Sequence, residues 1–599
     1  MSDETTLTGA EQVAWDLGDL YGGADDPRLG ADLDQADAQA GGLRAQYYGR
    51  IAGLSPEQLR TMLQEYEAIY ELAAKVGSYA YLFWSANTTD PARGALMQRA
   101  TERESRLSQE LVFVELEWAN APDDVAQKLI ESPELARYRH YLEKARLYRP
   151  HVLSEPEEKV LAEKSVTGRS AWERFFNETH SAATFELDGE KLSKEKVLSK
   201  LQSPDRDLRK RAAASVTAGL RDLSRTSTYI LNNLLADKAS DDRLRHYESW
   251  ISARNLANEV DDQVVEALVR AVTGRYDIVA RYYRLKRRLL GLDELFEYDR
   301  YAPLPAAQHF YPWEETRQIV LDAYRAFHPS MAEIAGWFFE RHWIDAAIRP
   351  GKIGGAYSAG TVPSVHPYVL LNYEARPRDV MTVAHELGHG VHQALSREQG
   401  MLQMHTPLTT AETASVFGEM LVFQDLMRRE SDPQVRLTML TGKLEDSFAT
   451  VFRQVSMNRF EDAIHAARRN EGELTTERYN ALWLDTQRAM FTDSVSLTAD
   501  YGLWWSYIPH FINTPGYVYA YAFGELLVLA LYARYQQVGA EFPGKYLEML
   551  SAGGSNWPHE IVRPLGVDLN DLNFWKDGLQ ILDDMVSEAE KLAGGGDRR

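Results

Sequence analysis

The chain has 599 residues, of which 44% are hydrophobic and 26% charged, so it can bury a large core and is neither fibrous nor low in complexity. The formal net charge of −22 disfavours a nucleic-acid partner, which normally requires a clustered basic face. The chain has no cysteine, which excludes disulfides, Cys-ligated zinc, iron–sulfur clusters and thiol catalysis.

The first residues, MSDETTLTGAEQ, are polar and acidic and lack the basic and apolar segments of a secretory signal. The longest apolar run, residues 526–531, is much shorter than the ~20 residues that cross a bilayer, so it predicts a buried core helix. We therefore expect a cytoplasmic protein that has no membrane partner. The last residues, 594–599, are Gly-rich and charged and are expected to be disordered.

Apolar residues recur at three- and four-residue steps through much of the chain, which predicts a mostly α-helical fold. The clearest helical stretches are residues 59–84, 100–118, 264–289 and 314–334. Two segments break the pattern. Thr184–Leu187 is followed by Asp188-Gly189, a favoured hairpin turn, and predicts a strand pair that separates an N-terminal helical region (1–190) from a larger region (191–599). β-branched and aromatic residues at 363–373 predict a strand just before a helix near residues 379–396.

The helix predicted near residues 379–396 contains the motif H-E-x-x-H, as H-E-L-G-H at residues 385–389. Residues four apart lie on one helix face, so His385 and His389 can bind one metal ion while Glu386 projects beside it. Zinc takes nitrogen and oxygen ligands, lowers the pKa of a bound water and polarises a peptide carbonyl. Glu386 can act as the general base that takes the proton from water and delivers it to the leaving amine.

Two partly exposed histidines on a helix would produce the same five-residue pattern by chance. The flanking residues favour the metal site, because Val383, Leu387 and Val391 predict a buried helix. Gly388 and Gly390 weaken a helix but permit another backbone to approach closely. Another constraint must therefore favour glycine at these two positions.

A third ligand must come from outside the motif, and the downstream candidates are His392, His405, Glu412 and Glu419. His392 lies on the same helix, and one straight helix supplies three ligands to a tetrahedral centre poorly. The metzincin spacing would need a histidine at Leu395, and the thermolysin and aminopeptidase-N spacings a glutamate at Thr409 or Leu408. None of these classes fits.

Glu412 and Glu419 belong to a second predicted helix, residues 410–428, and lie seven residues apart, roughly on one face. Glu412 can be the carboxylate ligand and Glu419 a residue that orients a histidine, but periodicity does not rank the two. Glu412 also has a structural interpretation, because Thr409-x-x-Glu412 has the spacing of a capping box.

The segments HELGHGVH (385–392) and ETASVFGE (412–419) resemble the M3 family of metallopeptidases, most closely its oligoendopeptidase F branch and more distantly thimet oligopeptidase. WDLGDLY (15–21), GGAY (354–357) and the His366-Pro367 strand match as well. The resemblance implies that Glu412, rather than Glu419, joins His385 and His389 in binding one Zn²⁺ per chain. It also implies a large multi-lobed helical bowl or clam with a deep channel and a small β-sheet beside the zinc helix.

In the M3 family the channel excludes folded proteins, so the resemblance implies oligopeptide substrates, bound as an added strand at the edge of the small sheet. The residues expected to contact substrate are Gly354, Gly355, Ala356, Tyr357 and His366.

The segment IPHFINTPGYVYAY, residues 508–521, resembles the family segment that closes over the metal. The resemblance implies that His510, Tyr517 and Tyr521 stabilise the oxyanion, where one donor can contribute ~3 kcal/mol. An aromatic loop packed into the core is the alternative interpretation. Gly524 stands where the thimet branch has a further tyrosine, so the full set of contacts need not carry over.

Together these features predict a zinc-dependent endopeptidase that hydrolyses internal bonds of short oligopeptides. Two alternatives stay open: an M3-type exopeptidase similar to dipeptidyl carboxypeptidases, and an inactive zinc-containing scaffold that binds peptides. An exopeptidase needs a fixed charge to hold a substrate terminus, and the sequence does not locate one. Glu386 argues against the scaffold, because a protein that only binds peptides needs no general base.

Overall fold

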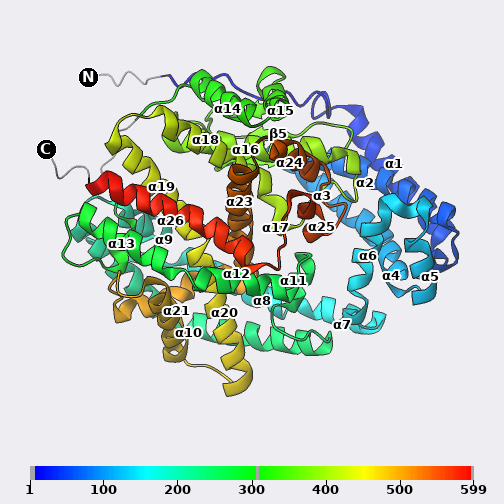
Figure 1. The fold of residues 1–599 in the computed structure, drawn as a ribbon. Coiled ribbons are helices and arrows are strands. Elements are labelled where there is room, and N and C mark those ends of the chain that lie inside the picture. Colours follow the sequence, from blue (N-terminus) through cyan, green and yellow to red (C-terminus); the bar gives the residue numbers. More distant parts are fainter. Residues whose placement is uncertain (1–6, 305–308, 595–599) are drawn as a thin grey trace. The chain divides into compact units, whose positions relative to one another are not determined.

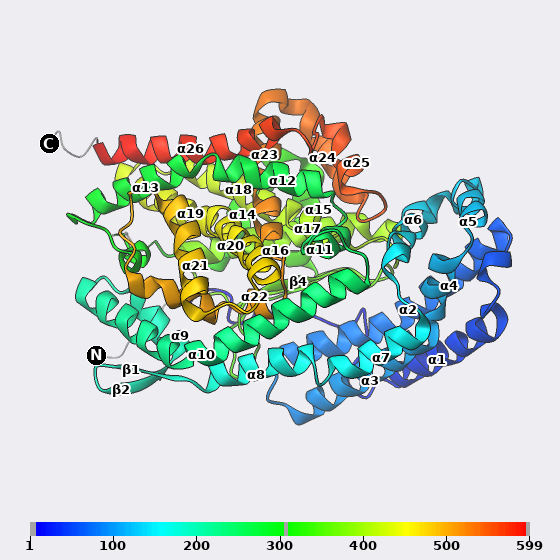
Figure 2. The same cartoon turned by 90° about the horizontal axis from the view of Figure 1, so that it is seen from below.

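The computed structural model describes residues 7–304 and 309–594 and is mostly α-helical, as the sequence predicts (Figures 1 and 2). The residues at 595–599 that we expect to be disordered lie outside the described ranges. The chain divides into two compact units. Unit 1 comprises Met1–Arg149, Gln308–Arg429 and Arg534–Asp568, and unit 2 comprises Pro150–Ala307, Glu430–Ala533 and Leu569–Arg599. These units interleave along the chain, and residue 190, the predicted division, lies within unit 2.

Unit 1 contains two groups of helices and one small sheet. The first group is α1 (Pro27–Tyr47), α2 (Pro56–Ser85), α3 (Pro91–Leu111), α4 (Phe113–Asn120), α5 (Asp123–Ile130) and α6 (Arg139–Leu147). The second is α14 (Trp313–Phe327), α15 (Pro329–Glu340), α16 (Pro377–Ser396), α17 (Leu408–Ala411), α18 (Thr413–Arg429), α24 (Phe542–Ser551) and α25 (Pro558–Val562). Asp26, Ser55 and Asp90 cap α1, α2 and α3, and each of these helices has a proline in its first turn.

Unit 2 contains the long helix α10 (Arg206–Leu244), and strand β1 (Thr184–Leu187), which pairs with β2 (Glu190–Ser193), packs against this helix. Its other helices are α7 (Glu155–Ser165), α8 (Arg169–Ala182), α9 (Lys194–Ser199), α11 (Ser252–Ala257), α12 (Asp262–Thr273), α13 (Tyr276–Leu289), α19 (Pro433–Thr450), α20 (Phe452–Glu471), α21 (Thr476–Phe491), α22 (His510–Asn513), most of α23 (Tyr519–Val538), and α26 (Leu572–Gly594). The predicted hairpin is confirmed: Leu187 pairs with Glu190 across Asp188 and Gly189, which both have positive φ.

Three of the four predicted helical stretches are each divided into two helices. Residues 264–289 form α12 and α13, which Gly274 and Arg275 separate. Residues 314–334 fall on α14 and α15, and the division comes at Pro329, which cannot continue a helix. Residues 100–118 similarly fall on α3 and α4. The periodicity of apolar residues indicates which face of a helix is buried. This buried face can continue from one helix to the next across a short break.

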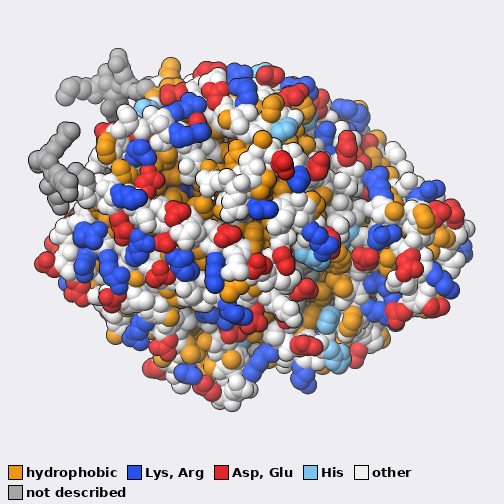
Figure 3. All heavy atoms as spheres, viewed as in Figure 1, with side chains coloured by type: hydrophobic (Ala, Val, Ile, Leu, Met, Phe, Trp, Pro, Cys, Tyr) orange, Lys and Arg blue, Asp and Glu red, His pale blue; other side chains and the backbone are white. Residues whose placement is uncertain are grey.

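Residues 526–531 are confirmed as a buried helix, because they lie in α23 and none is more than 2% exposed. Over the described ranges, no helix combines the length and the apolar character needed to cross a bilayer. On the face shown in Figure 3, acidic and basic side chains are interspersed, so the net negative charge does not gather in one area of that face.

A three-stranded sheet with the order β3-β5-β4 lies beside α16 in unit 1. The buried central strand β5 (Tyr368–Leu370) pairs in parallel with β3 (Ile344–Asp345) and antiparallel with β4 (Tyr357–Ala359). The strand predicted at 363–373 is therefore confirmed in its central part, as is the small sheet beside the H-E-x-x-H helix. β4 is an edge strand of this sheet.

Lys352 lies in the loop between β3 and β4 and fixes this loop through hydrogen bonds. Its buried ammonium group donates to the Asp345 carboxylate (2.6 Å) and to the carbonyl oxygens of Asp345 (3.1 Å), Ala347 (2.9 Å) and Leu371 (2.5 Å). Asp345, 1% exposed, also pairs with Arg349 at 2.6 Å. One lysine therefore connects the ends of β3 and β5 to the loop that leads into β4.

We expect Lys352→Met to destabilise unit 1 by about 3–5 kcal/mol, because it removes the buried ammonium partner of Asp345 and takes the side-chain donor away from the carbonyl oxygens of Ala347 and Leu371. The matched control is Lys128→Met on α5, where the lysine is exposed and the effect should stay within about 0.5 kcal/mol. Urea unfolding of both variants measures the difference, and equal midpoints would contradict this role of Lys352.

Candidate metal centre

Helices α16 and α18 pack closely at Gly388, in the middle of the H-E-x-x-H motif. A Cβ atom on Gly388 would lie 2.6 Å from Ser415 Cα and would overlap the Ala414 carbonyl. Both are backbone atoms of α18, which cannot move aside as a flexible side chain could. Only glycine permits this crossing, which brings the start of α18 against the two histidines.

Two further glycines allow neighbouring side chains to pack closely against α16 and α18. A Cβ atom on Gly390 would overlap the Phe338 ring of α15. Gly418 of α18 faces the hydroxyl of Tyr324, which donates a 2.6 Å hydrogen bond to the Ala384 carbonyl of α16. The constraint that the sequence implied for Gly388 and Gly390 is thus close helix packing on both sides of α16.

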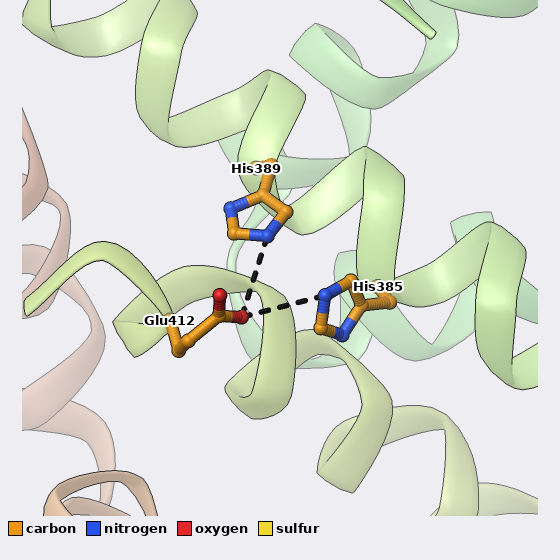
Figure 4. A group of neighbouring side chains, drawn as sticks. All are labelled: His385, His389 and Glu412. Atoms are coloured by element: carbon orange, nitrogen blue, oxygen red, sulfur yellow. Dashed lines mark ion pairs between the residues drawn. The ribbon is translucent and has the colours of Figure 1, made fainter. Parts of the chain in front are cut away.

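His385, His389 and Glu412 converge in this region (Figure 4). Glu412 Oε2 lies 3.4 Å from His385 Nε2 and 3.4 Å from His389 Nε2, and one ligand atom from each residue lies within 4.8 Å of the others. Ligands ~2.0–2.1 Å from a tetrahedral zinc ion lie ~3.3–3.4 Å from one another. The donor set, two imidazole nitrogens and one carboxylate oxygen, fits such an ion, and so do the two distances from Glu412 Oε2.

Glu412 occupies a break between α17 and α18, where the backbone forms a turn. Ser415 Oγ donates to its Oε2 atom at 2.8 Å. Burial raises the pKa of Glu412, but hydrogen bonding to His389 and the charges of both histidines outweigh burial and lower this pKa to about 2. The capping-box interpretation is wrong: Pro407 occupies the N-cap of α17, and Thr409 lies inside that helix.

Glu419 lies on the other side of His385, with Oε1 2.6 Å from Nδ1. Burial lowers the pKa of His385, but the bond to Glu419 and the nearby carboxylates raise it overall, to about 9. Because Nε2 faces Glu412 and Nδ1 faces Glu419, His385 can present Nε2 to a metal that replaces the Nε2 proton, while Glu419 orients the ring through Nδ1. This arrangement distinguishes the two glutamates, which periodicity did not rank.

Glu386 is 6% exposed and lines a cavity of about 430 Å³ together with the three candidate ligands. Burial is the main reason that its pKa is raised, and the two histidines partly oppose this effect. A carboxylate whose pKa moves toward neutrality is a better general base at neutral pH.

The predicted substrate residues divide into three groups. Ala356 and Tyr357 line the cavity, and Tyr357 begins the edge strand β4. Gly354 and Gly355 precede the lining residues and are exposed. His366 is buried, stacked on Trp343 with ring centroids 3.7 Å apart, and is not among the lining residues. A substrate role for His366 stays a prediction.

Several residues that the sequence did not single out for substrate also line the cavity: Ser358, Gln393, Ser396, Met404 and Thr406. Gln393 connects α16 to the edge strand, because Ser358 Oγ donates to Gln393 Oε1 (2.7 Å) and Gln393 Nε2 donates to the Ser358 carbonyl (3.3 Å). Its position four residues after His389, on the same helix face, was the available signal. His392 and His405 line the cavity too, but among the described residues the group that can hold a metal contains neither.

His510, Tyr517 and Tyr521 lie together in unit 2, around α22 and the start of α23. His510 Nε2 is 3.3 Å from the Tyr521 hydroxyl, and the ring centroids of Tyr517 and Tyr521 are 5.0 Å apart. The candidate ligands belong to unit 1, so contact between these three side chains and a substrate is part of our proposal below.

Comparison with known families decides the class of protein. A model of peptidase family M3 matches residues 199–581, more than half of the chain, and a model described as oligopeptidase F matches residues 117–185. The chain belongs to peptidase family M3. It is a metallopeptidase, and its His–His–Glu group is where the required divalent metal is expected to bind.

Individual relatives match nearly the whole chain. The chain is 28% identical to oligopeptidase PepF of Bacillus subtilis over 557 residues, which is 92% of this chain and 83% of that protein. It is 26% identical to an oligoendopeptidase F homologue of Lactococcus lactis over 97% of each chain. Its fold matches a Chlamydophila abortus protein described as a peptidase, with a TM-score of 0.89, 25% identity, and coverage of 97% of this chain and 98% of that one.

We expect Gly388→Ala to lower stability by about 1–3 kcal/mol, because the new methyl group must push α18 away from α16. The same shift moves Glu412, so zinc affinity should fall as well. Gly41→Ala is the matched control: Gly41 lies in α1 of the same unit with nothing within 4 Å of a Cβ position, and alanine there should stabilise by up to about 1 kcal/mol. Urea unfolding and zinc titration test both variants, and unchanged zinc affinity in Gly388→Ala would contradict the expected shift.

The isosteric pair Glu412→Gln and Glu419→Gln separates the two glutamate roles. Loss of the carboxylate that orients His385 should weaken zinc binding about 10–100-fold. Loss of the Glu412 charge should weaken zinc binding further, because that carboxylate faces both Nε2 atoms. Competition with a chromogenic zinc chelator measures both affinities, and a larger loss in Glu419→Gln would reverse the assignment.

Proposed function

We propose that this chain is a zinc-dependent endopeptidase that hydrolyses internal bonds of short oligopeptides. The observation that carries the proposal is the convergence of His385, His389 and Glu412 on one point, with Glu386 in the same cavity. Relatives named oligopeptidase or oligoendopeptidase over most of the chain support the substrate class. Zinc is the metal that the nitrogen and carboxylate donors favour.

In this proposal each side chain has one task. A zinc ion bound by His385, His389 and Glu412 would lower the pKa of a water molecule and polarise the scissile carbonyl. Glu386 accepts the proton of the attacking water and then donates it to the leaving amine. Glu419 keeps His385 in the orientation and tautomer that leave Nε2 for the metal.

Peptide binding and oxyanion stabilisation involve the remaining predicted residues. We propose that the substrate extends along the edge strand β4 at Ala356 and Tyr357, where it can add as a further strand. We further propose that His510, Tyr517 and Tyr521 donate hydrogen bonds to the carbonyl oxygen as negative charge develops on it. Donors aimed at such a charge act mainly on kcat.

The exopeptidase alternative requires a fixed charge that holds a substrate terminus. Among the described residues lining the cavity, none is lysine or arginine. A carboxypeptidase would lack an obvious partner there for the terminal carboxylate, which favours internal cleavage. A cytoplasmic location also stays a proposal, consistent with the absence of cysteine.

We expect wild-type protein with one equivalent of zinc to cut a decapeptide blocked at both ends at an internal bond, and Glu386→Gln to lose at least about 10²-fold in kcat while retaining zinc. Mass spectrometry of the products and metal analysis of both proteins provide the measurement.

Two other results of this experiment would support the exopeptidase or the peptide-binding scaffold. Cleavage only of an unblocked peptide, in steps from one end, would support the exopeptidase. No cleavage by either protein despite bound zinc would contradict this substrate class and favour the peptide-binding scaffold.

A further inference from the structure

The segment that carries His510, Tyr517 and Tyr521 contains a tight turn at Gly516. Gly516 has φ +74°, a conformation that non-glycine residues rarely adopt. A Cβ atom there would lie 3.4 Å from both Arg254 Cβ and Trp250 Cζ3. The turn is therefore closely packed, and its conformation determines the direction in which Tyr517 leaves it.

A buried carboxyl group binds this turn. Glu461, on α20, is 1% exposed, and its Oε1 atom accepts a 2.8 Å hydrogen bond from the Gly516 N–H. Its other oxygen, Oε2, is buried and has no hydrogen-bond partner among the described residues. Burial of a carboxyl group with so few partners is costly, so this residue is not explained by packing alone.

Residues of the 250–258 segment, which lies near Glu461, contact the turn at Gly516 and the residues that follow it. The Arg254 guanidinium lies 6.0 Å from the centre of the Tyr517 ring, and Asn258 Nδ2 donates to the Tyr519 hydroxyl at 2.8 Å. Trp250, which packs against Gly516, donates through Nε1 to Asp462 at 2.8 Å. Glu461 and its neighbour Asp462 thus connect α20 to the turn and to the Trp250–Asn258 segment. All of these residues belong to unit 2.

We propose that Glu461 is a positioning residue of the peptidase: through its hydrogen bond to Gly516 it fixes the turn that holds Tyr517 and Tyr521 in place to donate to the substrate oxygen. The proposal rests on the proposed function, because it assigns Glu461 a task only if these tyrosines act in catalysis. A displacement of about 1 Å in a catalytic group can cost on the order of 10²-fold in rate. A residue that never touches substrate can therefore govern kcat.

The protonation state expected for Glu461 is consistent with this positioning role. Burial raises the pKa of Glu461 to about 8, although the Gly516 N–H and the nearby Arg254 oppose the rise. The carboxyl group is then largely protonated at neutral pH, and its carbonyl oxygen still accepts from Gly516. A glutamine amide has nearly the same shape and also offers an acceptor oxygen, so it should replace Glu461 well.

The test compares Glu461→Gln and Glu461→Met, with Glu297→Met as the matched control. Glu297 is also buried in unit 2, at 5% exposure, and accepts from the Thr498 backbone N–H at 3.2 Å. It therefore reports the general effect of removing a buried acceptor. Each zinc-loaded protein is assayed for kcat and KM on a quenched fluorescent peptide, and for the inhibition constant of a phosphinate peptide that mimics the tetrahedral transition state.

We expect Glu461→Met to lower kcat about 10–100-fold with KM changed less than about threefold, and to weaken phosphinate binding by a similar factor. Glu461→Gln should stay within about threefold of wild type in kcat. Glu297→Met should lower the melting temperature but leave kcat nearly unchanged. Normal kcat in Glu461→Met, or an equal loss in Glu297→Met, would overturn the proposal.

A double-variant cycle separates failure of this proposal from failure of the proposed function. If Glu461 acts through Tyr517 and Tyr521, adding Glu461→Met to the combined variant Tyr517→Phe/Tyr521→Phe should leave kcat within about threefold of that combined variant. Multiplicative losses would show that Glu461 acts independently and would overturn the inference. Unchanged kcat in the combined tyrosine variant would reject both the oxyanion role of the two tyrosines and the inference, whereas full activity of Glu386→Gln would reject the proposed mechanism itself.

Discussion

The close packing of α16 against α18 at Gly388 is the constraint on which the candidate metal centre depends. A side chain at this position would overlap backbone atoms of Ala414 and Ser415, so the two helices can meet here only if the residue is glycine. The contact places Glu412, at the break before α18, within reach of two histidines on α16. A helix-weakening glycine inside the H-E-x-x-H motif is therefore a packing requirement.

Two carboxylate groups of unit 1 contact the candidate histidine ligands from different sides. Glu412 faces Nε2 of both rings, and Glu419 engages Nδ1 of His385 from the opposite side. Ser415, from the first turn of α18, also bonds to Glu412. The turn before α18 thus supplies a candidate ligand, and α18 supplies the group that holds this ligand and the group that orients a histidine. Because these groups lie on or next to one helix, we expect the crossing of α16 and α18 at Gly388 to affect all three together.

The residues proposed to donate to the oxyanion are held by buried side-chain contacts rather than by close packing of two helices. His510 lies in the short helix α22, Tyr517 in the turn that follows it and Tyr521 in the first turns of α23, so a short connecting segment with little rigidity of its own positions these residues. The hydrogen bond from Gly516 to Glu461 and the packing of Trp250 supply contacts that the loop lacks. In unit 1 backbone packing defines the site, whereas in unit 2 buried polar contacts hold the proposed donors.

The sequence alone determined the helical class, the H-E-x-x-H helix, the strand beside it and the buried helix at 526–531, because each depends on periodicity or spacing within a short segment. It overestimated helix lengths at Pro329 and Gly274, since a buried face can continue across a break. Tertiary structure alone distinguished Glu412 from Glu419 by geometry, connected Gln393 to the edge strand, and brought Glu461 to Gly516 from 55 residues away in sequence. Spacing along one helix specifies which side chains share a face, but only the packing of separate helices specifies which faces meet.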